Sequence, residues 1–123
     1  LSVIGDLYKT EVYELCHFLN SRSTIIPENI LTKAPSAELR PGQKDSDSLP
    51  EYDILDQILF RHIEQRKTMR QIIESGFDAS TVERIIKLVA VSEYKRFQFA
   101  PILRISEKAF GYGRRMPIVA KYF

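Results

Sequence analysis

Two short segments of this sequence combine cations and an aromatic ring in a way that suits a phosphorylated ligand. Lys9 falls in the first turn of an expected helix, where the macrodipole disfavours a cation unless an anion lies nearby. Because free N–H groups at a helix N-terminus attract phosphate, Lys9 is a candidate phosphate ligand, although a lysine directed into solvent fits the same position. Tyr94 and Lys95 place a ring beside a cation, which suits a ring-bearing phosphate ester. The cation alone would also stabilise a helix C-terminus.

A third segment, residues 35–50, is a long loop rich in polar groups. It contains three prolines and one glycine, and its hydrophobic residues follow no period. Loops of this length are uncommon inside compact domains and are typical of binding loops, lids or disordered linkers. A lid can close over a polar ligand and exclude water, whereas composition alone equally describes a linker. The side chains available to a ligand include Ser36, Glu38, Arg40, Asp45 and Asp47.

The sequence shows no other catalytic pattern. It has no glycine-rich phosphate loop, no Ser/His/Asp arrangement and no metal-ligand spacing, so we assign no catalytic or metal-binding residue. His62 has no second ligand at metal spacing and is expected to pack at the edge of a helix face. Cys16, the single cysteine, cannot form an internal disulfide and is expected to be a small buried hydrophobic residue.

Hydrophobic periodicity predicts helices for most of the chain. Leu1 to Ile4 is expected to end a strand, and Asp6 to cap a helix that runs to about Asn20. A brief helix is expected from Pro27 to Lys33, and a longer one carries the apolar stripe that starts at Leu55.

Two candidate capping boxes predict the remaining helices. Thr68 with Gln71 opens a short helix that ends near Gly76. Ser80 with Glu83 opens a longer helix that runs to about Gln98, before Pro101. The expected fold class is therefore mainly α, with a long loop and an irregular C-terminal segment.

Charge and hydropathy limit the possible classes of protein. Of the 123 residues, 44% are hydrophobic, which is enough for a core and excludes a disordered chain. Residues 95–123 hold seven basic residues and one acidic residue, so this basic tail carries +6 while the remainder carries −4. The tail is either a solvated surface or an anion site. The sequence contains no membrane-spanning run or signal peptide, and we expect a cytoplasmic protein.

These segments together resemble NAD synthetase of the glutamine-dependent kind, over nearly the whole chain. The resemblance is carried by Gly5-Asp6-Leu7-Tyr8-Lys9-Thr10, Pro35-Ser36-Ala37-Glu38-Leu39-Arg40-Pro41-Gly42-Gln43 and Glu93-Tyr94-Lys95-Arg96, in that order. It implies that residues 1–123 are the C-terminal part of an α/β doubly wound synthetase domain of the adenine nucleotide α-hydrolase type. Residues 35–50 would then be the family's mobile loop.

The resemblance also implies a reaction and roles for particular residues. In the family, ATP adenylates the carboxylate of deamido-NAD, and ammonia derived from glutamine displaces AMP to give NAD. Lys9 and Ser36 would bind ATP, Tyr94 and Lys95 would bind deamido-NAD, and Mg²⁺ would accompany the ATP. The loop, with Glu38, Arg40, Asp45 and Asp47, would order over the adenylate. The implied partners are the rest of the synthetase domain, a glutaminase domain and further subunits of a homo-oligomer.

The chain departs from the family pattern in ways that define its expected activity. The family's SGGxDS pyrophosphate loop is missing, and Cys16 does not match the glutaminase nucleophile. Ile102 and Phe97 stand where relatives often have glycine and a basic residue. We therefore expect a ligase fragment that is inactive alone.

Two alternatives from other classes remain open at this point. Residues 68–89 give two short helices around Gly76, the outline of a helix-turn-helix module that binds nucleic acid. The stripe Val82, Ile85, Ile86 and Val89 could instead support subunit contacts.

Overall fold

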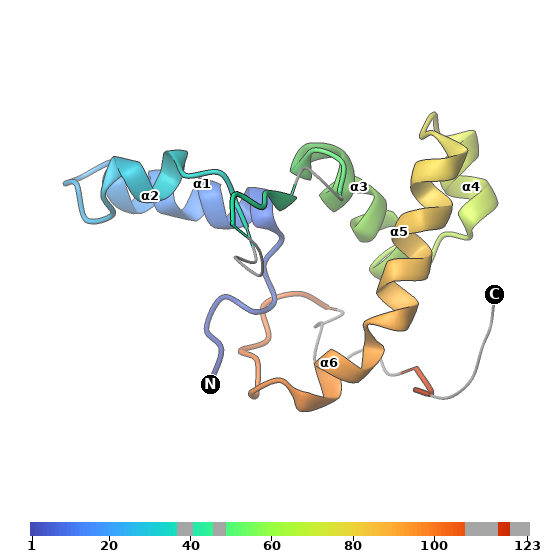
Figure 1. Cartoon of the computed structure of the whole chain (residues 1–123). Helices are drawn as coiled ribbons and strands as arrows, with labels where there is room; N and C mark the ends of the chain where they lie inside the picture. The colour runs from blue at the N-terminus through green and yellow to red at the C-terminus, as the bar shows by residue number, and fades with distance from the viewer. Residues whose placement is uncertain (37–40, 46–48, 108–115, 119–123) are drawn as a thin grey trace. The chain divides into compact units, whose positions relative to one another are not determined.

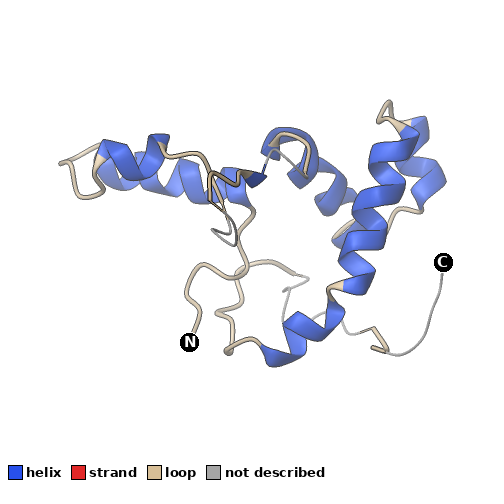
Figure 2. Ribbon diagram, in the orientation of Figure 1, coloured by secondary structure: helices blue, strands red, loops and turns tan. Residues whose placement is uncertain are grey.

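The computed structural model describes residues 1–36, 41–45, 49–107 and 116–118 (Figure 1). Helices joined by loops make up these residues, as Figure 2 shows. The chain divides into two compact units, Tyr8–Asp56 and Leu1–Leu7 with Gln57–Phe123. The helices are α1 (Lys9–Asn20), α2 (Glu28–Thr32), α3 (Tyr52–Ile63), α4 (Met69–Glu74), α5 (Ala79–Val91) and α6 (Glu93–Gln98).

In the unit Tyr8–Asp56, α1 and α2 form a hairpin that is fixed by one side chain. The amide of Asn20 accepts the backbone N–H groups of Ile25 and Ile26 at 3.0 and 2.9 Å and donates to the carbonyl of Ile26 at 2.8 Å. An Asn side chain can make these bonds together because it carries both an acceptor and a donor group. The expected helix end at Asn20 and the brief helix after Pro27 are both confirmed.

The expected cap of α1 was wrong. Tyr8 is the N-cap residue, and its N–H donates to a carboxylate oxygen of Glu11 at 2.8 Å. Asp6 is buried and instead accepts the N–H groups of Ile105 and Ser106 at 2.8 and 2.6 Å. A buried carboxylate needs several donors, and the two consecutive backbone N–H groups satisfy this need better than one helix end.

In the other unit, the first residues pair with the segment after Pro101 through a single parallel bridge. Ser2 forms a parallel bridge with Ile102, in which Ser2 N–H donates to the Pro101 carbonyl at 2.8 Å and Leu103 N–H donates to the Ser2 carbonyl at 3.0 Å. The strand character expected for the first residues is thus present as one bridge. Gly5 lies against it: a Cβ there would be 2.7 Å from Ser2 Oγ.

Helices α4 and α5 pack against each other (Figure 1). The capping box of Thr68 and Gln71 opens α4 as expected, and Gly76, with φ of 102°, follows its end. The Arg61 guanidinium lies 4.8 Å from the centre of the Phe77 ring, which links the last turn of α3 to the α4–α5 turn. The deepest apolar side chains of this unit are Ile58, Ile63, Ile72, Val82 and Ile85.

Two features of the predicted 80–98 helix were wrong. Its N-cap is Asp78, not Ser80: the Asp78 carboxylate accepts the Thr81 N–H at 2.8 Å and the Ser80 hydroxyl at 2.6 Å. An ionised carboxylate also interacts favourably with the helix dipole, which a serine hydroxyl does not. The helix then breaks at Ser92 into α5 and α6. The first residue of α6, Glu93, is buried, and its carboxylate binds Arg96 and the N–H of Met116.

Candidate functional site

Lys9 is the first residue of α1 and lies beside an aromatic ring. Its ammonium nitrogen is 5.2 Å from the centre of the Tyr13 ring, one helical turn further on. This cation–π contact holds the half-buried side chain at the start of the helix. A ligand with negative charge would therefore meet both the ammonium group and the positive end of the helix dipole.

Ser36 lies at the base of the 35–50 loop, where the two sides of the loop are bonded to each other. The Asp45 N–H donates to the Pro35 carbonyl at 2.9 Å, and the Asp45 carbonyl accepts the Leu49 N–H at 2.9 Å. The hydroxyl of Tyr52, at the start of α3, donates to the Asp45 carboxylate. Burial raises the pKa of the Tyr52 phenol, and the bond to Asp45 raises it further, so the hydroxyl remains a donor at neutral pH.

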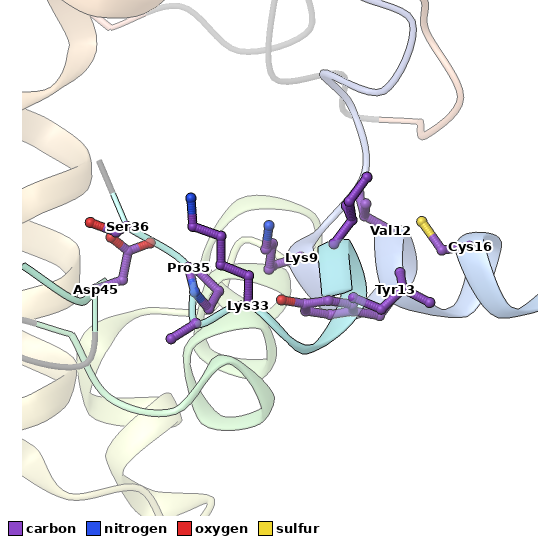
Figure 3. A pocket seen from close by; sticks show the side chains of 11 residues that line it. Lys9, Val12, Tyr13, Cys16, Lys33, Pro35, Ser36 and Asp45 are labelled. Carbon is purple, nitrogen blue, oxygen red and sulfur yellow. The ribbon is translucent and has the colours of Figure 1, made fainter. Parts of the chain in front are cut away.

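Lys9 and Ser36 line the same pocket, which has a volume of about 310 Å³ (Figure 3). Both were predicted to bind ATP, and the fold brings them together although 26 residues of chain separate them. The remaining lining residues are Val12, Tyr13, Cys16, Ile30, Leu31, Lys33, Ala34, Pro35 and Asp45. The pocket thus has an aromatic and aliphatic floor with two lysines and a hydroxyl at its rim, which suits a ring linked to phosphate groups.

Lys33 is a pocket residue that the sequence analysis missed. It follows α2 directly, three residues before Ser36, and Figure 3 shows its ammonium end directed to the same side as that of Lys9. Its position close to Ser36, a predicted ATP contact, could have identified Lys33 from the sequence. Cys16 also lines the pocket and is only half-buried, so the expectation of a fully buried cysteine was wrong.

The residues predicted to bind deamido-NAD belong to the other unit. Tyr94 and Lys95 are exposed on α6, whereas Glu93 and Arg96 on the same helix form an ion pair that is largely buried. The ion pair fixes α6, so its exposed side presents the ring and the ammonium group to solvent. Glu38, Arg40 and Asp47 lie outside the described residues.

The residues that the structure describes do not form a metal site. They include no group of three His, Cys, Asp or Glu side chains that could hold a metal ion. Asp45 is the single carboxylate among the described lining residues of the pocket, and Tyr52 is hydrogen-bonded to it. Mg²⁺ prefers octahedral oxygen ligands, and the described lining residues offer it too few such groups. Within the described part of the chain, no helix has the length and apolar character needed to cross a bilayer.

Comparison with known proteins identifies the family. The model of the family described as NAD synthase matches residues 1–99. This chain belongs to the NAD synthase family. The match covers Lys9, Ser36, Tyr94 and Lys95, and it gives no support to the helix-turn-helix alternative, although α4 and α5 do form a helix pair.

Individual members of the NAD synthase family match nearly all of the chain. Glutamine-dependent NAD(+) synthetases from Synechocystis sp. and Acinetobacter baylyi are each 52% identical to it, over 99% and 96% of its length. The chain spans about a fifth of the length of these curated relatives, 22% of each.

A solved structure of the family agrees with the helical arrangement described above. It is a glutamine-dependent NAD+ synthetase from Acinetobacter baumannii in complex with adenosine diphosphate. It is 42% identical to this chain and matches it with a TM-score of 0.57, over 93% of this chain and 19% of that one.

Proposed function

We propose that this chain provides part of the synthetase site of a glutamine-dependent NAD synthetase, which makes NAD from deamido-NAD, ATP and ammonia. The observation that carries the proposal is the shared pocket of Lys9 and Ser36. Two lysines at its rim can offset phosphate charge, and the Tyr13 ring and neighbouring aliphatic groups offer an apolar surface. The adenosine diphosphate in the related Acinetobacter baumannii structure supports an adenine nucleotide as the ligand class.

The proposed reaction has two steps that balance without a redox partner. A carboxylate oxygen of deamido-NAD attacks the α-phosphorus of ATP, and the bond to pyrophosphate breaks, which leaves an acyl-adenylate. Ammonia then attacks the carbonyl carbon, AMP leaves with the former carboxylate oxygen, and the nitrogen loses a proton. Cations near the triphosphate favour the first step because they stabilise charge on the departing pyrophosphate.

Within this reaction we assign Lys9 and Ser36 to ATP, and Tyr94 and Lys95 to deamido-NAD. The exposure of Tyr94 and Lys95 on α6 supports the second assignment, since both side chains are available to a ligand. The loop 35–50 would order over the adenylate. The described residues include no group of three metal ligands, and in the whole enzyme Mg²⁺ would be bound by ATP and by other residues.

The whole enzyme would supply what this chain does not carry. The parallel bridge of Ser2 and Ile102 supports a position at the edge of a parallel sheet, as in a doubly wound α/β domain. A glutaminase domain would provide ammonia, and a homo-oligomer would be the working form. The words glutamine-dependent in the names of the relatives support the glutaminase domain.

The assignment of Lys9 is tested in the full-length synthetase by steady-state kinetics with ammonia as the nitrogen source. Lys9→Ala is expected to raise KM for ATP about tenfold, since a charge-assisted contact to phosphate is lost. Lys87→Ala, an exposed lysine of α5 outside the pocket, is the matched control and should leave the constant unchanged. An unchanged KM for ATP in Lys9→Ala would remove Lys9 from the ATP site.

The assignment of the chain as one part of the site is tested by turnover. The full-length enzyme should form NAD from deamido-NAD, ATP and ammonia, and the 123-residue chain alone should form none. Measurable turnover by the chain alone would contradict this division of the site.

A further inference from the structure

The first two turns of α3 carry a phenol and a carboxylate that bond to two separate segments beside the pocket. Tyr52 and Asp56 are four residues apart, so they lie on the same face of the helix. The Tyr52 hydroxyl donates to the Asp45 carboxylate. Oδ2 of Asp56 accepts the backbone N–H of Thr10 at 2.8 Å, across 46 residues of sequence.

Each of these bonds ends next to a residue assigned to ATP. Thr10 follows Lys9 in the first turn of α1, so Asp56 fixes the backbone from which the Lys9 side chain projects. Asp45 itself lines the pocket, and its N–H is bonded to the carbonyl of Pro35, the residue before Ser36. Tyr52 therefore fixes the loop base from which Ser36 projects.

Burial makes both hydrogen bonds costly to replace by hydrogen bonds to water. Asp56 is 8% exposed, so its carboxylate cannot exchange the Thr10 N–H for water without a cost. It also places a negative charge beside the N-terminus of α1, where the helix dipole favours it. The Tyr52 phenol is half-buried, and its hydroxyl donates to the Asp45 carboxylate.

We propose that Tyr52 and Asp56 are positioning residues that hold Lys9 and Ser36 at the spacing required by the ATP phosphates. Neither residue lines the pocket, so each acts through another: Tyr52 through Asp45, and Asp56 through Thr10. The proposal rests on the assignment of this pocket to ATP. It adds that α3 connects the two sides of the pocket, so that the loss of either hydrogen bond weakens the binding of ATP.

The test compares Tyr52→Phe and Asp56→Asn in the full-length enzyme. Tyr52→Phe keeps the ring and removes only the hydroxyl, and Asp56→Asn keeps an acceptor oxygen but removes the charge. Each should raise KM for ATP about tenfold and weaken the calorimetric affinity for ADP by a similar factor, while KM for deamido-NAD changes less than twofold. Asp56→Ala, which removes the acceptor, should have the larger effect, and Asp56→Asn should restore part of it.

Asp53→Asn is the matched control because Asp53 is an exposed carboxylate on the same helix turn. It should leave both KM values and the ADP affinity unchanged. A Tyr52→Phe or Asp56→Asn enzyme with a lower unfolding temperature but unchanged ATP and ADP constants would overturn the positioning role. Equal increases in KM for ATP and for deamido-NAD would overturn it too.

The same measurements separate this inference from the proposed function. If Lys9→Ala weakens the binding of ATP and ADP but Tyr52→Phe and Asp56→Asn do not, the positioning role fails and the ATP site stands. If the wild-type enzyme neither forms NAD nor binds ADP, both fail.

Discussion

At the residue scale, buried carboxylates fix this structure by binding backbone N–H groups of distant segments. Asp6 bonds to Ile105 and Ser106, and Asp56 bonds to Thr10. Such bonds are worth more than neutral ones, and a buried N–H that loses its acceptor costs about 1–3 kcal/mol. Single acidic residues therefore set where α1 begins and where the segment after α6 lies against the N-terminal residues.

Gly5 gives a residue-scale prediction because it lies against the Ser2–Ile102 bridge. A Cβ at Gly5 would be 2.7 Å from Ser2 Oγ and 3.1 Å from side-chain carbons of Ile102. Gly5→Ala should therefore destabilise the chain by about 1–3 kcal/mol through overpacking. Thermal unfolding followed by circular dichroism measures the loss as a lower midpoint.

The double variant Ser2→Ala, Gly5→Ala is the control for this prediction. It removes the closest contact and should recover part of the lost midpoint, while the contact with Ile102 remains. A Gly5→Ala chain as stable as wild type would show that the bridge has more room than its backbone positions indicate.

At the element scale, the N-cap of α5 is an ionised carboxylate with a pH-dependent effect. Hydrogen bonds from the Ser80 and Thr81 hydroxyls and the Thr81 N–H lower the pKa of Asp78 from 3.8 to about 2. Because the folded pKa is below the unfolded one, Asp78 stabilises α5 fully above pH 3.8, and this contribution is lost as the pH falls towards 2.

We expect the wild-type chain to lose more helical stability between pH 4 and pH 2 than an Asp78→Asn chain does. Asn keeps a good N-cap acceptor but does not titrate in this range. The measurement is the thermal midpoint of the circular dichroism signal at each pH. Identical pH profiles for the two chains would exclude Asp78 as the titrating group.

Sequence reasoning located the elements better than the bonds that connect them. Periodicity and capping patterns gave the C-terminal end of α1 and both ends of α4 because those signals are local. They failed at the start of α5, where Asp78 caps the helix in place of Ser80. They also failed at Ser92, because the Glu93 that follows it is held by Met116, 23 positions away. Local patterns contain no information on such long-range contacts.

The candidate site was also predicted only in part from the sequence. Lys9 and Ser36 were predicted from a family resemblance, and the pocket brings them together. Lys33 was within reach of sequence reasoning because it is close to Ser36. The roles inferred for Tyr52 and Asp56 were not, since they depend on hydrogen bonds that close only in the folded chain.

At the scale of the whole molecule, α1 presents an apolar face that the described part of this chain does not cover. Leu15, Phe18 and Leu19 are 37%, 67% and 40% exposed, and no described residue of α1 is buried. The chain spans 22% of the length of its curated relatives. We therefore expect other parts of the synthetase domain to cover this face in the whole enzyme, because apolar area of this extent is costly in water.

This expectation predicts a difference between the 123-residue chain and the full-length enzyme in binding the dye ANS, whose fluorescence reports exposed apolar surface. The isolated chain should bind more ANS per mole, although it is much shorter. Replacing Leu15 and Leu19 with Ser should reduce this binding in the isolated chain, whereas Glu14→Ser, an exposed polar position of the same helix, should not. In the full-length enzyme the Leu15, Leu19 double variant should instead lower the unfolding temperature, since covered leucines contribute about 2–5 kcal/mol each. If the full-length variant kept its unfolding temperature and the wild-type enzyme bound ANS as strongly as the chain, the α1 face would be solvent-exposed in the enzyme as well.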